Sequence, residues 1–148
     1  NCLSSQAFGC YIQTDGTTET RGIELSGSYA ITDRLRLSGA YTLTNTENDG
    51  DRVVRVPRHD FALALEADVT DRLQVGVNMT RVADALDGFG TLTPLDDYTV
   101  WDVTARYDIT DAASVYGAID NIGDESYQTV RGFNAPERTI RFGIETTF

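Results

Sequence analysis

His59 is the only histidine of the chain, and it stands beside Asp60. A histidine next to a carboxylate could serve as the general base for a nucleophilic serine, as in serine hydrolases. That chemistry needs a serine within hydrogen-bond reach, and the sequence places none there. The sequence also lacks a Gly-x-Ser-x-Gly elbow, a Walker loop and a His/Cys spacing for a metal. We therefore predict no enzymatic activity, no catalytic residue, no cofactor and no metal site, and we interpret His59 as a structural residue.

An oxygen-rich stretch lies at residues 45–52, which read Asn-Thr-Glu-Asn-Asp-Gly-Asp-Arg. Oxygen-bearing side chains at alternate positions, with glycine at the sixth, are loosely similar to a calcium-binding loop. Such a loop ends in a glutamate at its twelfth position, where this chain has Val56. A solvated turn is therefore the better interpretation of this segment.

The two cysteines, Cys2 and Cys10, are eight positions apart. In a cytosolic protein they would be unrelated thiols, whereas in a cell-envelope protein they indicate one disulfide that closes a small loop. We expect the disulfide if the protein lies in the envelope. Residues 1–3 have neither the basic nor the apolar region of a signal peptide, so we expect the chain to be processed or cut from something longer.

The charge of the chain excludes one class of partner. The formal net charge is −11 and the isoelectric point is near 4.3. No basic stripe is present, which argues against binding to nucleic acid. All 12 basic residues are arginines, which can grip carboxylates or phosphates with two parallel hydrogen bonds. This property suits either ion-pair networks or contacts with a phosphorylated lipid surface such as lipopolysaccharide.

The elements that would position these residues are marked by a repeat. An Ile/Val-Thr-Asp tripeptide occurs at residues 31–33, 69–71 and 109–111, at spacings of 38 and 40 residues. Each copy ends one run of alternating apolar and polar residues and starts another, so each predicts a tight turn between two strands. The stretches halfway between the copies are long and rich in Gly, Pro or Asp. Short turns at one end and long loops at the other are typical of a transmembrane β-barrel.

The alternation predicts an all-β chain with about seven or eight antiparallel, up-and-down strands. One face of the strands is apolar, and the other carries small residues and charges. The predicted strands cover residues 8–14, 20–31, 35–46, 59–69, 73–83, 98–109, 114–121 and 138–148, the first of them being the weakest. The charged residues of the polar face are Glu24, Arg36, Glu66, Asp68, Asp102, Arg106 and Asp108.

A soluble antiparallel sandwich would also alternate apolar and polar residues. However, the apolar runs last roughly 9–11 residues, which is the length that a tilted strand needs to cross a membrane and longer than most globular strands. Tyr29, Tyr41, Tyr98 and Tyr107 lie near predicted strand ends, where a barrel has its aromatic girdles. No apolar run approaches the roughly 20 residues of a spanning helix. The sequence therefore favours a transmembrane barrel.

Three segments resemble the TonB-dependent outer-membrane receptors. Residues 121–138 are similar to the last hairpin of that family, in which an Asn-Leu-Phe-Asp-x-x-Tyr turn precedes a loop with Gly-Tyr and Pro-Gly-Arg. Here Ile122 and Gly123 replace the Leu-Phe pair, and Glu137 replaces the glycine. Residues 20–25 are similar to the family's Arg-Gly-Val-Glu strand start, and residues 55–59 to its Arg-x-Pro-x-His strand start. The sequence of residues 127–133 looks most like that of the vitamin B12 receptor branch.

The resemblance implies a 22-stranded barrel of the Gram-negative outer membrane, filled by a plug and importing a metal chelate with energy passed on by TonB. Residues 1–148 would then be the C-terminal part of the barrel, with the plug absent. The implied partners are a cobalamin or ferric siderophore, TonB through the plug, outer-membrane lipid and lipopolysaccharide, and the barrel-assembly machinery. The alternative is a complete eight-stranded barrel with a structural or adhesive role.

Two sets of site residues follow from this resemblance. The C-terminal residues Arg141, Gly143 and Phe148 are similar to the signal read by the barrel-assembly machinery, although Thr146 departs from the usual hydrophobic residue. The second set offers aromatic faces and bidentate donors that could hold a corrinoid or an anionic siderophore. Its members are Arg52, Tyr98, Tyr127, Arg131, Phe133 and Asn134.

Overall fold

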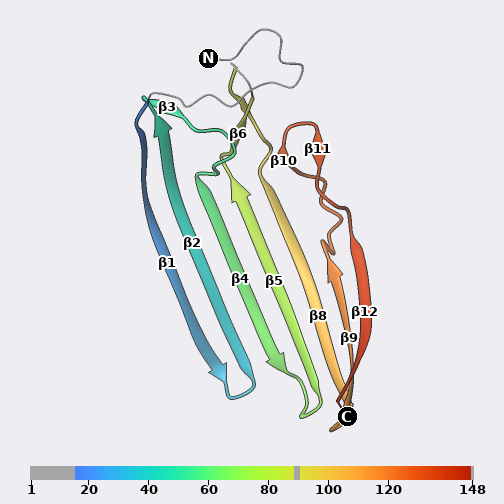
Figure 1. The fold of residues 1–148 in the computed structure, drawn as a ribbon. Coiled ribbons are helices and arrows are strands. Elements are labelled where there is room, and N and C mark those ends of the chain that lie inside the picture. The colour runs from blue at the N-terminus through green and yellow to red at the C-terminus, as the bar shows by residue number, and fades with distance from the viewer. Residues whose placement is uncertain (1–15, 89–90, 148) are drawn as a thin grey trace.

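The computed structural model describes residues 16–88 and 91–147, and within these ranges it contains strands and no helix. Seven long strands form one antiparallel sheet in the order β1-β2-β4-β5-β8-β9-β12 (Figure 1). Their bounds are β1 Thr18–Thr32, β2 Leu35–Asn48, β4 His59–Asp68, β5 Leu73–Ala83, β8 Tyr98–Thr110, β9 Ala113–Asp120 and β12 Thr139–Thr146. Each long strand pairs with the next long strand along the chain, which is the up-and-down order predicted from the sequence.

Five short strands lie in the long connections. β3 (Asp51–Arg52) pairs with the end of β2, β6 (Leu86–Asp87) pairs with β7 (Thr93–Pro94), and β10 (Gln128–Val130) pairs with β11 (Phe133–Asn134). The sequence analysis did not predict these short strands within the long loops. We call the segment from β10 to β11, residues 128–134, the hairpin.

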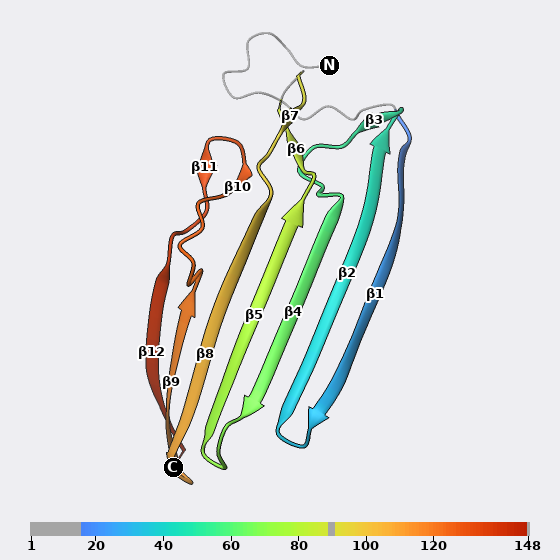
Figure 2. The same cartoon turned by 180° about the vertical axis from the view of Figure 1, so that it is seen from behind.

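Long loops and short turns lie at opposite ends of the sheet, as the view from behind in Figure 2 also shows. The loop end carries residues 49–58, 84–88, 91–97 and 121–138. The turn end carries residues 33–34, 69–72 and 111–112. The sheet is open, because β1 and β12 are its two edges and do not pair with each other.

The register confirms the two predicted faces. Ile23 pairs with Leu43 and Leu25 with Tyr41, so apolar residues of neighbouring strands lie side by side on one face. Within residues 16–88 and 91–147 no protein layer covers this apolar face: Ile23 is 57% exposed and Phe142 is 89% exposed. A soluble sandwich would bury these side chains against a second sheet. A single sheet with a bare apolar face is instead typical of a barrel wall that faces lipid.

The predicted strands agree with the structure to within about three residues at either end for the seven long strands. The predicted strand at residues 8–14 lies outside the described residues. In the ranges that the structure describes, no helix is long and apolar enough to cross a membrane.

Candidate functional site

The six predicted ligand-binding residues all lie at the loop end of the sheet. Arg52 is in the first long loop, Tyr98 is the first residue of β8, and the other four belong to the loop between β9 and β12. The structure divides them into two groups with different surroundings. One group is an aromatic cluster, and the other is part of the polar framework that holds the loops in place.

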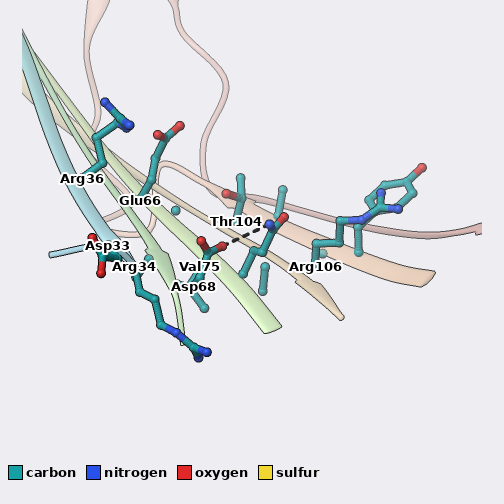
Figure 3. Close-up of a pocket in the computed structure, with 15 residues that line it drawn as sticks. Asp33, Arg34, Arg36, Glu66, Asp68, Val75, Thr104 and Arg106 are labelled. Carbon is teal, nitrogen blue, oxygen red and sulfur yellow. Dashed lines mark hydrogen bonds between the residues drawn. The ribbon is translucent and has the colours of Figure 1, made fainter. Parts of the chain in front are cut away.

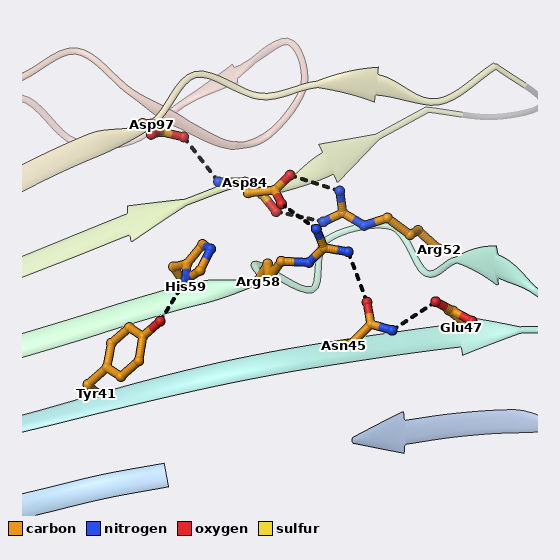
Figure 4. A network of polar contacts seen from close by, with 8 residues as sticks. All are labelled: Tyr41, Asn45, Glu47, Arg52, Arg58, His59, Asp84 and Asp97. Carbon is orange, nitrogen blue, oxygen red and sulfur yellow. Dashed lines mark hydrogen bonds and ion pairs between the residues drawn. The ribbon is translucent and has the colours of Figure 1, made fainter. Parts of the chain in front are cut away.

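The polar framework centres on Asp84, which joins the first two long loops (Figure 4). Arg52 donates from Nη1 to Asp84 Oδ1 and from Nη2 to the Asp84 carbonyl, both at 2.8 Å. Arg58 Nη1 lies 3.3 Å from the other carboxylate oxygen, and the Asp84 amide donates to Asp97 at 3.0 Å. The hydrogen bond from Arg52 is the main cause that lowers the pKa of Asp84. Both guanidinium groups of this framework are therefore already engaged by protein.

The oxygen-rich segment at residues 45–52 is used in the same framework. Residues 45–48 are the end of β2, Asp49 and Gly50 form a turn, and Asp51–Arg52 are β3. Arg58 Nη2 donates to Asn45 Oδ1 at 3.0 Å, and Asn45 Nδ2 donates to Glu47 Oε1 at 2.8 Å (Figure 4). Within residues 16–88 and 91–147, no group of three His, Cys, Asp or Glu side chains is placed to hold a metal ion.

The aromatic cluster is formed by Tyr98 and the segment around the hairpin. The rings of Tyr98 and Tyr127 stack with their centroids 4.0 Å apart. Tyr127, Phe133 and Asn134 line an open hollow of about 590 Å³, and Phe133 is 72% exposed. Asn134 Oδ1 accepts a hydrogen bond from Gln128 Nε2 at 2.7 Å, which ties the two hairpin strands together. We call Tyr127, Phe133 and Asn134 the aromatic patch.

The two predicted arginines differ in what they can offer a ligand. Arg52 is part of the Asp84 framework, so its guanidinium is not directed at the aromatic patch. Arg131 lies in the hairpin turn and is exposed, while its backbone amide donates to Asp87 Oδ2 at 2.7 Å. Of the two, Arg131 is therefore the one placed near the patch.

Sequence reasoning missed a second feature of this end, a cavity of about 160 Å³ beneath the hairpin. Its polar lining comes from Arg55, Asp60, Asp96 and Gln128, and Tyr98 lies on its wall. These residues are far apart in the chain, so no local pattern brings them together.

One of the three segments that carry the family resemblance, residues 121–138, forms the third long loop. Asn121 is only 4% exposed and has a φ of 52°, and its side chain accepts from the Glu125 amide and donates to the Glu125 carbonyl, both at 2.8 Å. The Asp124 carboxylate accepts from the Arg138 amide at 2.9 Å and pairs with its guanidinium at 3.3 Å. The Arg138 amide is the main cause that lowers the pKa of Asp124. Asn121 and Asp124 therefore shape the base of the loop through bonds within it.

His59 and Asp60 do not form a catalytic pair. As neighbours on β4 they point to opposite faces of the sheet. His59 Nδ1 lies 2.8 Å from the hydroxyl of Tyr41, with the two rings nearly parallel. This contact joins His59 of β4 to Tyr41 of β2 near the loop end.

The polar face contains a second hollow, toward the turn end, of about 510 Å³ (Figure 3). Its charged lining includes Arg36, Glu66, Asp68 and Arg106, four of the residues predicted for the polar face. Gln74 Nε2 donates to Asp68 at 3.1 Å across the hollow's wall. Both signs of charge are thus presented on the side of the sheet opposite the apolar face.

Two of the three residues of the predicted insertion signal, Arg141 and Gly143, lie within the described residues. On β12, Arg141 Nη2 pairs with Asp120 of β9 at 2.7 Å. Gly143 lies beneath the ring of Tyr116, so that a Cβ atom added at Gly143 would overlap that ring. This packing explains why a residue without a side chain fits at position 143, which the sequence did not reveal. Phe148, Cys2 and Cys10 lie outside the described residues.

The chain matches a family model. Residues 2–122 match the model described as "TonB dependent receptor-like, beta-barrel", which is most of the chain. The matched part includes all the long strands except β12, and it ends at the base of the third long loop.

Individual relatives and structures agree with this match. The chain is 28% identical to the iron-regulated outer membrane virulence protein of Vibrio cholerae over 140 residues, covering 88% of this chain and 22% of the relative. It is 29% identical to the vitamin B12 transporter BtuB of Photobacterium profundum, covering 82% and 20%. The fold is similar to that of Pseudomonas aeruginosa FpvA bound to ferric pyoverdine, with a TM-score of 0.77 at 23% identity over 87% of this chain and 19% of FpvA. The chain thus spans about a fifth of the length of these relatives.

Proposed function

This chain belongs to the family of TonB-dependent outer-membrane receptors, and we propose that it supplies the C-terminal strands of a receptor barrel that actively imports a metal chelate. The observation that carries the proposal is the open sheet, with a bare apolar face on one side and a charged face on the other. In a bilayer both edge strands need partners, because unpaired backbone groups are costly in hydrocarbon. Further barrel strands beside β1 and β12 would satisfy them.

The alternative, a complete barrel of eight strands, is less well supported. β1 and β12 stand at opposite edges of the described sheet. The relatives are also about five times as long as this chain. The structural and adhesive role that we considered with that alternative therefore gains no support from the fold.

The proposed orientation places the loop end outside the cell and the turn end in the periplasm. Outer-membrane barrels have long outer loops and short periplasmic turns, and the sheet has the same asymmetry. The aromatic patch and Arg131 would then meet a ligand arriving from outside. A cobalamin or a ferric siderophore fits this surface, because both present large, partly apolar rims with hydrogen-bonding groups.

The proposed partners follow from the two faces. The charged hollow around Arg36 and Glu66 would face the plug domain inside the barrel, and TonB would act through that plug. The apolar face would contact outer-membrane lipid and, at its outer rim, lipopolysaccharide. The barrel-assembly machinery would read the end of β12 and Phe148. We propose transport and no catalytic step.

The test is uptake by cells that lack the gene of the full-length receptor. Radiolabelled cyanocobalamin and radiolabelled ferrioxamine B are supplied separately, with and without an intact TonB system. Loss of uptake of one probe, restored by the cloned gene only when TonB is present, is the expected result. Normal uptake of both probes and of other ferric siderophores in the deletion strain would contradict the proposal. Repression of the gene by cobalamin would favour the corrinoid, and induction by iron starvation would favour a siderophore.

A further inference from the structure

Asp87 is the most deeply buried large side chain in the part of the chain that the structure describes. It is 2% exposed, although it lies in a loop beyond the end of a single-layered sheet. Asp87 belongs to β6, which pairs with β7 in the second long loop. Charged side chains are almost never fully buried unless they are paired, so this carboxylate must be held by specific partners.

The partners come from all three long loops. Arg55 Nε, in the first loop, donates to Asp87 Oδ1 at 2.9 Å. The Gly88 amide, in the second loop, donates to the same oxygen at 2.8 Å, and the Arg131 amide, in the third loop, donates to Oδ2 at 2.7 Å. A single carboxylate therefore joins segments that are 32 and 44 residues away along the chain.

The bond between the Arg131 amide and Asp87 differs from the other hydrogen bonds of the hairpin, because it reaches another loop. The other hydrogen bonds of residues 127–135 in the described structure stay within the third loop, such as those between Gln128 and Asn134 and between the Ala135 amide and the Tyr127 carbonyl. The first two loops, by contrast, are also joined by the Asp84 framework and by a bond from the Arg55 amide to the Leu86 carbonyl. Beside the stacking of Tyr127 on Tyr98, the hairpin is thus joined to another loop by one hydrogen bond in the described structure, while the other two loops share several.

We propose that Asp87 is a positioning residue for ligand recognition, a latch that fixes the hairpin and with it the aromatic patch of Tyr127, Phe133 and Asn134. This inference rests on the proposed function, because it assumes that the patch meets the chelate. Fixing the hairpin before binding removes part of the entropy that a ligand would otherwise lose in ordering it. The latch would therefore set the affinity of the outer surface, while the barrel and its coupling to TonB remain independent of it.

The substitution Asp87→Asn separates the latch from the rest of the loop contacts. An asparagine has one acceptor oxygen, and its amide nitrogen is a donor. Placed with its oxygen toward Arg55 and Gly88, it keeps two of the three bonds and turns a donor toward the Arg131 amide. This orientation loses the fewest bonds, so the variant breaks the hairpin bond selectively.

The experiment measures amide hydrogen exchange in the purified full-length receptor without ligand. In Asp87→Asn, exchange of the Arg131 amide should rise about tenfold or more, whereas exchange of the Gly88 amide should change little. The matched control is Asp84→Asn, which weakens the contacts of Arg52 and Arg58 and should leave Arg131 unchanged. Heat modifiability shows whether each variant still forms a folded barrel. Unchanged exchange at Arg131 in a folded Asp87→Asn receptor would overturn the latch.

A second readout addresses recognition. Uptake of cyanocobalamin and of ferrioxamine B is measured over a range of concentrations, and for the probe that the receptor imports, Asp87→Asn should raise KM several-fold with little change in the maximal rate. An unchanged KM together with faster exchange at Arg131 would refute the positioning role. Absence of uptake of both probes by the unmodified receptor would count against the proposed cargo alone, because the exchange result does not depend on it.

Discussion

The two ends of the sheet reach a defined structure by different means. At the turn end each connection contains the same threonine bond to its own backbone, and exposed side chains such as Arg34 and Asp71 link neighbouring turns. At the loop end the carboxylates of Asp84 and Asp87 join one loop to another. The contrast teaches which parts of this barrel wall can tolerate change independently. Loss of the threonine bond of one turn should stay local, because that bond lies within the turn, but a change at Asp87 should be felt in the first and third loops.

The turn end shows why the Thr-Asp repeat exists. The hydroxyls of Thr32, Thr70 and Thr110 each accept the backbone amide two residues later, at 3.2 Å in all three turns. Thr70 also accepts the Leu73 amide at 3.0 Å. A side chain that bonds the backbone just beyond it stabilises a tight turn locally, so the same residue type recurs wherever the turn recurs.

The loop end instead contains residues in an uncommon backbone conformation. All five non-glycine residues with positive φ in the described ranges lie there: Asp49, Arg55, Asp84, Asn121 and Asp124. Such a conformation is costly for most residue types, although Asn and Asp tolerate it best. The bonds of Asp84 to the first loop and of Asn121 within the third loop offset this cost. The loop end is therefore held by specific side-chain bonds rather than by one repeated turn motif.

The largest expected effect tests whether the two ends face different compartments. In the full-length receptor with Cys2 and Cys10 replaced by serine, the variants Asp51→Cys and Asp111→Cys place a single thiol at the loop end and at the turn end, respectively. Both native side chains are exposed. On intact cells an impermeant maleimide should label the first variant and not the second. Gly88 is an unsuitable position, because its φ is 136° and a side chain there would overlap the Thr91 carbonyl.

Both variants should be labelled after the cells are lysed, which serves as the control for reactivity. Labelling of the turn-end cysteine alone on intact cells would invert the proposed orientation. It would also remove the basis for a ligand site at the aromatic patch.

The next effect concerns the base of the third loop. Asn121→Ala removes the bonds to the Glu125 amide and carbonyl and places an alanine at a φ of 52°. We expect the free energy of local opening, measured by exchange of the Glu125 amide, to fall by about 2 kcal/mol. Asn121→Gly is the matched control, because it relieves the backbone cost without restoring the bonds, and it should lose less. Equal losses in both variants would show that backbone conformation contributes nothing here.

The strands and turns were predictable from the sequence because their causes are local. Alternation along residues such as Leu63 and Leu65 defines a face, and a threonine before a short turn defines its end. The loops were not predictable, because the contact of Arg55 with Asp87 spans 32 residues. Arg52 shows the consequence: its chemistry suggested a ligand contact, yet its guanidinium is bound to Asp84. The cargo remains a proposal for the same reason, since residue type alone does not show which groups are free.

Acid should separate two sets of backbone amides, because those of Arg131 and Arg138 at the loop end donate to carboxylates, whereas those inside the turns donate to threonine hydroxyls. The Arg131 amide, followed by the Gly88 amide and Arg55, holds the pKa of Asp87 below its ordinary value of 3.8. A carboxyl group whose pKa is lowered in the folded state adds stability that is complete above the unfolded value. This stability is lost as the pH falls through the lowered folded value. The link to the hairpin should therefore hold from neutral pH down to about 4.5 and weaken only in stronger acid.

The measurement is exchange of the Arg131 and Arg138 amides, each corrected for the pH dependence of its intrinsic rate, beside the Ala112 amide at the turn end. The first two donate to carboxylates and should lose protection below pH 3.8, whereas Ala112 donates to the Thr110 hydroxyl and should not. Arg138 faces Asp124, whose pKa is lowered by the same kind of bond. Parallel loss at all three amides would indicate general acid unfolding and contradict the separation.

A smaller effect is expected where β12 packs on β9, toward the turn end. Gly143→Ala should displace the Tyr116 ring at a cost of about 1 kcal/mol in the stability of the folded receptor, since overpacking forces a side chain from its place. Tyr116→Ala in the same chain removes the overlap and should abolish that cost. If outer-membrane levels of the double variant stay as low as those of Gly143→Ala, the glycine is needed by the assembly machinery itself. The outcome thus separates packing from recognition at a predicted insertion residue.

The smallest effect belongs to the turns. Thr70→Val keeps the shape of the side chain but removes the acceptor for the Arg72 and Leu73 amides. Both amides are exposed and can bond water instead, so we expect a loss of only about 0.5–1 kcal/mol, confined to the turn. Thr70→Ser, which keeps the hydroxyl, is the control and should retain most of the protection of the Leu73 amide. Because this turn shares no bond with the loop end, exchange of the Arg131 amide should be identical in all three proteins. A change at Arg131 would mean that the turns and the loops are coupled through the strands, and the independence of the two ends would then be wrong.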